Sequence, residues 1–262
     1  MIIGYRKSDF TDYGLKLPIE LVPGKRFSHI LICGKSGSGK SLAGRWWIYQ
    51  ILRHREGSMY LADFKGGEEY ETLEGSGSYS SGQKAIEMIH EFYEFFTQVR
   101  QNHIRLKQYY GLYIEEWMGL ITYAESHDKK LKASLMSELG EILALGRGYN
   151  IGITLTLQRA DANLFQNGTR EQFQVICAFG RCSTEAFRML GFSGEMEENP
   201  TFSYRPGQAL VLMDGQESIE EVIVPMVTNE KTMNEQIRYY LDQQPDLASL
   251  TRAIAEGRGP GL

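Results

Sequence analysis

Short apolar runs alternate along most of the chain with longer segments in which apolar side chains recur every three or four positions. The short runs, which are typical of buried strands, are HILIC, SMYLA, GLYI, NIGITLTL and QVICAF. The intervening segments predict helices in SLAGRWWIYQILRH, over 83–107 and around 131–143. Because strands that alternate with helices form right-handed βαβ units, the pattern predicts an α/β fold with a mostly parallel central sheet flanked by helices.

Two segments lack this alternation. Residues 1–27 predict an irregular lead-in with one short strand near 18–22. Residues 66–82 are rich in Gly, Ser and Glu, and this composition predicts an exposed loop.

Toward the C-terminus the apolar pattern changes again. GQALVLMDG and IEEVIVPMV predict a β-hairpin added to one edge of the sheet. A helix is predicted over 230–241, and the final GRGPGL predicts a frayed tail. We therefore divide the chain into a lead-in segment (1–27), a main α/β domain (28–228), and a C-terminal helix with a flexible tail (229–262).

Charge and cysteine content narrow the functional classes. The net charge is −5, yet residues 1–60 carry ten Lys and Arg against four Asp and Glu, so any DNA contact must come from local loops or from an assembled ring. There is no transmembrane-length apolar run and no secretory signal pattern, so we expect a cytoplasmic protein. Cys33, Cys177 and Cys182 predict buried, reduced thiols without metal-ligand spacing.

The stretch ICGKSGSGKS carries the strongest chemical signal, because it matches the spacing G-x-x-x-x-G-K-[ST] between a strand and a helix. Glycines let successive backbone N–H groups surround a polyphosphate, and the helix N-terminus adds its own. We expect Lys40 to lie on a solvent-facing loop and to reach the β- and γ-phosphates of ATP, and Ser41 to ligate Mg²⁺. The candidate nucleotide-binding residues are Gly34, Lys35, Ser36, Gly37, Ser38, Gly39, Lys40 and Ser41.

A P-loop of this kind needs an acidic partner at the end of a neighbouring strand, to hold Mg²⁺ and to orient water. Glu115 and Glu116 end the apolar run 112–114, and we assign Glu115 to the metal and Glu116 to the water. The alternative is a solvated acidic strand end. Asp63 is the competing acid, and we interpret it as a structural residue beside the site.

Two further polar residues flank the strand in NIGITLTLQR. Gln158 ends this strand, where its amide could sense the γ-phosphate, or it is simply a surface residue. Arg147 lies between two glycines before the strand, and it either completes a neighbouring subunit's active site or stabilises a helix C-terminus.

The order of these signals resembles the FtsK/SpoIIIE family of DNA-pumping ATPases. The motifs are GKSGSGKS, LADFKGGEEY, YIEEW, LGRGYNIGITLTLQRADANLFQNGTREQF and FGRCSTEAFRMLGF, over roughly residues 26 to 227. Within this family, the stretch QRADANLFQNGTREQF is most similar to the coupling proteins of conjugative elements from Gram-positive bacteria.

The resemblance implies a RecA-like P-loop NTPase fold, a hexameric ring around double-stranded DNA, and translocation driven by ATP hydrolysis. It also implies roles for single residues: Lys40 and Ser41 as the Walker A pair, Glu116 as the catalytic carboxylate, Gln158 as the sensor and Arg147 as an arginine finger.

The sequence departs from the family at several points. The family usually has Asp where this chain has Glu115, which changes the reach of the carboxylate toward the metal. DFKGG replaces the Asp-Pro-Lys common in DNA pumps and resembles the type VII secretion ATPases. We see neither the membrane-spanning region nor the winged helix of the large pumps, so we expect a motor domain. Its recruitment to the inner face of the membrane by an anchored partner subunit stays open.

Three functions are therefore compatible with the sequence. The first is a DNA translocase or coupling ATPase of a mobile element, favoured by QRADANLFQNGTREQF. The second is an ATPase that engages a protein substrate without direct DNA contact, favoured by DFKGG and by the acidic chain beyond residue 60. The third is a module that binds nucleotide without hydrolysing it, favoured only by Glu115.

Overall fold

A ten-stranded sheet forms the centre of the computed structural model, which describes residues 1–24, 27–160, 166–192, 205–216 and 218–258. Its strand order is β2-β1-β10-β9-β8-β3-β7-β6-β4-β5. The strands are β1 (Ile2–Arg6), β2 (Pro18–Glu20), β3 (Ile30–Gly34), β4 (Gly57–Asp63), β5 (Tyr79–Ser81), β6 (Tyr109–Glu115), β7 (Ile151–Leu157), β8 (Val175–Phe179), β9 (Gln208–Met213) and β10 (Glu220–Ile223).

The six strands from β8 to β5 run parallel to one another, as the alternating pattern predicts. The helices of the described chain are α1 (Lys7–Tyr13), α2 (Lys40–Arg53), α3 (Lys84–Gln101), α4 (Trp117–His127), α5 (Lys129–Leu145), α6 (Thr184–Leu190), α7 (Glu230–Leu241) and α8 (Leu247–Ala255). Short 3-10 turns are η1 (Glu68–Leu73), η2 (Gly146–Tyr149) and η4 (Gln166–Gln172).

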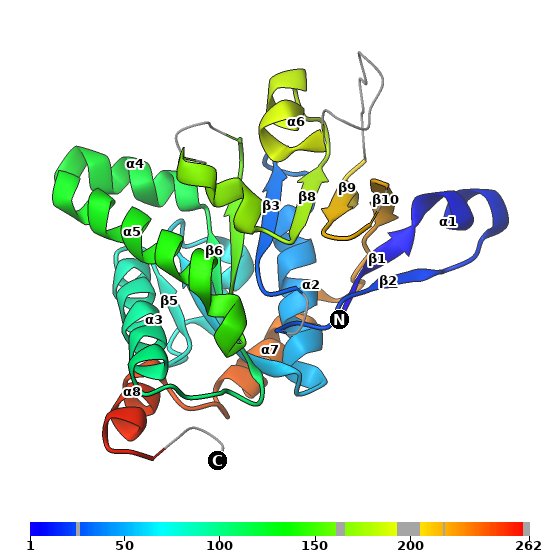
Figure 1. Cartoon of the computed structure of the whole chain (residues 1–262). Coiled ribbons are helices and arrows are strands. Elements are labelled where there is room, and N and C mark those ends of the chain that lie inside the picture. The colour runs from blue at the N-terminus through cyan, green and yellow to red at the C-terminus, as the bar shows by residue number, and fades with distance from the viewer. Residues whose placement is uncertain (25–26, 161–165, 193–204, 217, 259–262) are drawn as a thin grey trace.

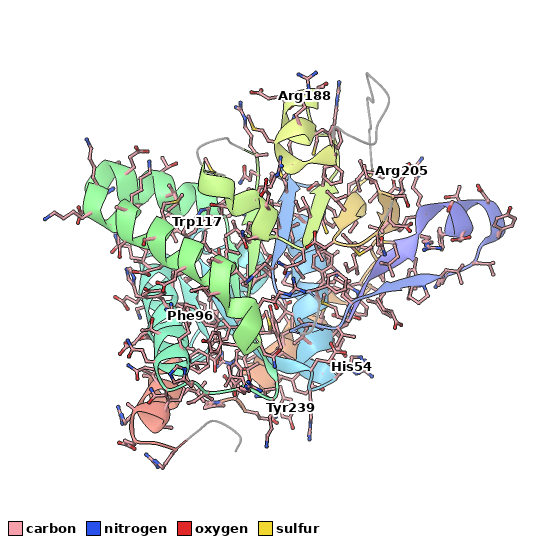
Figure 2. All side chains as sticks on the ribbon, viewed as in Figure 1. His54, Phe96, Trp117, Arg188, Arg205 and Tyr239 are labelled. Carbon is pink, nitrogen blue, oxygen red and sulfur yellow. The ribbon has the colours of Figure 1, made fainter. Side chains whose placement is uncertain are left out.

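Two apolar cores lie on opposite faces of the sheet. Helices α2 and α7 cover one face, and α3, α4, α5 and α8 cover the other (Figure 1). Side chains of β6 alternate between the faces, so that Tyr113 joins the α2 core while Leu112 and Ile114 join the α3 core. In the all-side-chain view of Figure 2, Phe96 and Trp117 belong to the α3 core, and both are fully buried.

The parallel strands bring their carboxyl ends to a single edge of the sheet. The loop after β3 therefore meets the ends of its two neighbours, β7 and β8, and β6 ends one strand further along. Ligand sites in sheets of this type form at this edge. It is the upper edge in Figure 1, where β3 and β8 end beneath α6.

The N-terminal segment is more ordered than the sequence predicts. The expected strand near 18–22 is β2, but β1 also forms and pairs with both β2 and β10. Ile3 of β1 is fully buried, and its carbonyl accepts a hydrogen bond from the Trp47 indole N–H at 2.9 Å. Strands β9 and β10 pair antiparallel, but β1 and β2 lie outside them in the sheet. The prediction that β9 and β10 form the edge of the sheet is therefore wrong.

Residues 66–82 do not form an exposed loop, which corrects the prediction from composition. This segment contains η1 and β5, and Tyr70, Leu73 and Tyr79 are buried in the α2 core. The large apolar side chains between the glycines, serines and glutamates bury enough surface to order the segment.

The C-terminal part contains the predicted helix, α7, and a second helix that the sequence analysis did not predict. Leu247, Leu250 and Ile254 of α8 are buried in the α3 core. The end of the expected frayed tail, residues 259–262, lies outside the described residues. Within the part that the structure covers, no helix combines the length and apolar character that crossing a membrane requires.

We predict that α8 contributes to global stability. Ile254, which is 1% exposed, should lower the free energy of unfolding by about 2–5 kcal/mol when replaced by Ala, because the change leaves a cavity between α8 and α3. Urea denaturation followed by circular dichroism measures this loss. Met226→Ala, at a side chain that is 87% exposed, is the control and should change stability by less than about 0.5 kcal/mol. Equal stability of the two variants would contradict the role of α8.

Candidate nucleotide-binding site

The P-loop joins the end of β3 to the start of α2. Gly37 and Gly39 adopt left-handed conformations, with φ of 77° and 91°, which favour glycine. A Cβ at Gly39 would also lie 2.6 Å from the backbone nitrogen of Gly207. Gly39 caps α2 without a side-chain hydrogen bond, so the positive end of the helix is open to an anion.

Lys40 is the first residue of α2 and is buried, with 6% exposure. The expectation that it lies on a solvent-facing loop is therefore wrong. Among the described residues, the side chain of Lys40 has no hydrogen bond or salt bridge. The Lys40 ammonium group is therefore available to an anion, and a bound phosphate would supply the opposite charge.

The two residues predicted to hold Mg²⁺ are in direct contact. The Ser41 hydroxyl donates a hydrogen bond to Oε1 of Glu115 at 2.8 Å, across the gap between α2 and the end of β6. Glu115 is only 2% exposed. Hydroxyl and carboxylate oxygens are the ligand type that Mg²⁺ prefers, so this pair fits the ion.

Glu115 has two further partners that the sequence analysis missed. Tyr70 and Tyr113 both donate to Oε2 of Glu115, Tyr70 at 3.1 Å. Burial and the neighbouring Glu115 charge hold the pKa of both phenols well above the usual range, so both stay protonated. Tyr113 could have been identified from sequence, because it precedes Glu115 by two positions on a strand and so shares its face.

Glu116 and Gln158 meet at the same edge of the sheet. The side-chain amide of Gln158 donates to Oε2 of Glu116 at 2.8 Å, and the Glu116 N–H donates to the Thr156 hydroxyl at 2.9 Å. Glu116 has a φ of 61°, which is uncommon outside glycine and is held here by the surrounding contacts. Thr156 is fully buried, and the available sequence signal for this support was a threonine within the apolar run NIGITLTL.

Asp63 ends β4 beside Glu115, and both of its carboxylate oxygens accept hydrogen bonds, from the following turn and from β5. It accepts hydrogen bonds from the backbone N–H groups of residues 65, 66 and 67 and from the Tyr79 hydroxyl, at 2.9 to 3.2 Å. Burial is the main reason that the pKa of Asp63 is raised. These contacts favour the structural interpretation of Asp63 over a metal-binding one.

Arg147 lies at the opposite edge of the sheet from the P-loop. It belongs to η2, which precedes β7, and its side chain is exposed. It is close enough to the buried His29, just before β3, to help lower the pKa of that imidazole to about 3, although burial is the larger cause. Arg147 therefore cannot act at the P-loop of its own subunit.

A cavity of about 510 Å³ opens beside the first residues of the P-loop. Its lining includes Gln158 and two basic residues that the sequence analysis did not select, Arg159 and Arg181. Both follow strands that flank β3, a position that was the available signal. Cys33 and Cys182 also line this cavity as free thiols, and burial raises the pKa of Cys33 to about 12.

Comparison with known proteins rests on structure alone. No protein-family model matches the sequence, and no curated protein matches it. The type VII secretion ATPase EccC of Thermomonospora curvata superposes with a TM-score of 0.66 at 17% identity, covering 94% of this chain and 31% of that one.

Two further solved structures are similar. EssC, ATPases 2 and 3, from Geobacillus thermodenitrificans gives a TM-score of 0.64 at 13% identity, over 97% of this chain and 49% of that one. The pCW3 conjugation coupling protein TcpA, solved as a monomer with ATPγS, gives 0.59 at 18% identity, over 84% and 66%. The chain thus spans less than two thirds of each of these proteins. It shares the mixed α/β fold of these P-loop ATPases.

Proposed function

We propose that this chain is an ATPase motor that couples ATP hydrolysis to movement of double-stranded DNA, as in a coupling protein of a conjugative or other mobile element. The observation that carries the ATPase assignment is the convergence at one sheet edge of the P-loop, the Ser41–Glu115 pair and the Glu116–Gln158 pair. The DNA assignment is supported by the sequence resemblance and by the shared fold of TcpA.

Each residue has a defined task in this proposal. The P-loop amides and Lys40 bind the phosphates of ATP, and Ser41 and Glu115 hold Mg²⁺, which offsets the negative charge of the phosphate oxygens. Glu116 orients a water molecule toward the γ-phosphorus and accepts its proton as the bond to the leaving ADP oxygen breaks. Gln158 holds the Glu116 carboxylate in place and lines the cavity beside the P-loop, from which its amide would sense the γ-phosphate.

A ring of subunits would give Arg147 a role in catalysis, and the position of this residue supports that proposal. This arginine is exposed and lies at the sheet edge opposite its own P-loop, which leaves it free to contact a neighbouring subunit. We propose a hexameric ring in which each Arg147 completes the next active site.

An ATPase that acts on a protein substrate is the second candidate. It is favoured by the DFKGG turn, in which Asp63 binds the N–H groups of Gly66 and Gly67, and by the shared fold of EccC and EssC.

Duplex DNA distinguishes the two candidates. We predict that it raises ATP turnover at about 50 mM salt and that this effect is largely lost by about 200 mM, because phosphate contacts release counterions. Heparin, a polyanion without base pairs, is the matched control and should have little effect. Equal stimulation by heparin, or none by DNA, would contradict DNA translocation. Stimulation by a polypeptide substrate alone would support the second candidate.

The phosphate-binding role of Lys40 can be tested by direct binding. Lys40→Ala should weaken the affinity for a fluorescent ATP analogue on the order of 100-fold, since a hydrogen bond to a charged group is worth about 1.5–3 kcal/mol. Lys84→Ala is the control, because Lys84 is also the first residue of a helix but is exposed and distant in sequence. Unchanged affinity in a folded Lys40→Ala protein would exclude the P-loop as the nucleotide site.

Mixing of inactive variants tests Arg147. Arg147→Ala and Glu116→Gln should each bind nucleotide but turn it over very slowly. A mixture of the two should regain part of the activity, because some interfaces then pair an intact Arg147 with an intact Glu116. A mixture of Glu116→Gln with the Glu116→Gln, Arg147→Ala double variant has no such interface and should stay inactive. No recovery in rings shown to exchange subunits would leave Arg147 a structural residue.

A further inference from the structure

The carboxylate of Glu115 has an unusual set of partners for a buried acid. Three side-chain hydroxyl groups surround it, and the two oxygens are used differently. Oε1 accepts from Ser41, on the side of the P-loop, while Oε2 accepts from Tyr70 and Tyr113, on the side of the α2 core. The tyrosines thus occupy one oxygen and leave the other directed toward the metal position.

The two phenols form a small network with fixed directions. Each has a single hydrogen to donate. Tyr113 donates to Glu115, and the Tyr70 hydroxyl lies 3.1 Å from both Oε2 and the Tyr113 oxygen, so its hydrogen is shared between them. Both side chains are at most 1% exposed, so these hydrogen bonds lie in the low-dielectric interior, where they are strengthened.

The fold provides space for Tyr113 in particular. Tyr113 and Glu115 are two positions apart on β6, so they point to the same face of the sheet. Helix α2 passes above them with Gly44, where an added Cβ would overlap with the Tyr113 hydroxyl. Because Gly44 has no side chain, the Tyr113 phenol has the space to reach the Glu115 carboxylate.

Residues of α2 and β5 hold the ring of Tyr70 in place. The Arg45 guanidinium lies 5.6 Å from the centre of its ring, and Arg45 itself binds Glu230 at 2.7 Å and Asn234 at 3.1 Å. Both of these residues belong to α7. Tyr70 also stacks on Tyr79 with ring centres 6.2 Å apart. These contacts from α2, α7 and β5 fix the phenol before any ligand binds.

We propose that Tyr70 and Tyr113 are positioning residues for Mg²⁺, which hold the Glu115 carboxylate so that only Oε1 faces Ser41 and the ion. The proposal rests on the proposed nucleotide-hydrolysing function. It also accounts for a glutamate at this position, because the two phenols bind its second carboxylate oxygen and so limit the freedom that the extra methylene would otherwise give.

Removing one phenol hydroxyl should therefore alter the response to Mg²⁺ rather than the nucleotide pocket. With Tyr113→Phe or Tyr70→Phe, the Mg²⁺ concentration that gives half-maximal binding of a fluorescent ATP analogue should rise about tenfold, since a hydrogen bond to a charged group is worth about 1.5 kcal/mol or more. Affinity for the analogue without Mg²⁺ should stay within about twofold of wild type.

The chain offers a matched control. Tyr79→Phe removes a buried hydroxyl from Asp63, the neighbouring carboxylate, and should leave the Mg²⁺ requirement unchanged. Folded Tyr70→Phe and Tyr113→Phe proteins with the wild-type Mg²⁺ requirement would overturn the proposal, as would an equal shift in Tyr79→Phe. If Tyr113→Phe does not fold, the Mg²⁺ requirement of Tyr70→Phe alone tests the proposal. Failure of the wild type to bind nucleotide at all would instead overturn the proposed function.

Discussion

The hydrogen bond between Ser41 and Glu115 joins the two halves of the site. It ties the first turn of α2 to the end of β6, two strands away from β3 in the sheet. This contact requires the parallel order of β3, β7 and β6, since only parallel strands bring the P-loop and the acidic residues to one edge. The strand order, the left-handed glycines of the loop and the placement of Lys40 all shape the same site, at the carboxyl end of β3.

Two adjacent glutamates have separate environments because the strand ends between them. Glu115 still follows the alternation of β6 and points to the buried face with Tyr113. Glu116 leaves the strand through a left-handed conformation and is half-buried, next to Gln158. A single step along the chain thus gives one carboxylate enclosed by hydroxyl groups and one that water can reach.

Local patterns predicted the parts of the protein that depend on local chemistry. The P-loop, the parallel strands, α3 and α7 follow from spacing and periodicity, as does the position of Glu115 and Glu116 at a strand end. The burial of Lys40 and the ordering of 66–82 did not, because both depend on contacts with residues distant in sequence. Helix α8 did carry local signals, the N-cap Asp246 and the apolar spacing of Leu247, Leu250 and Ile254, which the sequence analysis did not use. Tyr70 illustrates the difficulty: it lies 45 residues from Glu115, in a segment whose composition indicated a loop.

The contact between Arg45 and α7 has a consequence for how this unit can be exchanged between proteins. The Arg45 side chain is 4% exposed and lies on the helix that starts with Lys40, yet its ionic partner, Glu230, lies beyond the last strand. A gene fusion that joined the sheet to a foreign sequence after β10 would leave the buried Arg45 guanidinium without Glu230 and Asn234, its partners on α7. A fusion that preserves the surroundings of Arg45 would therefore have to keep the chain through α7.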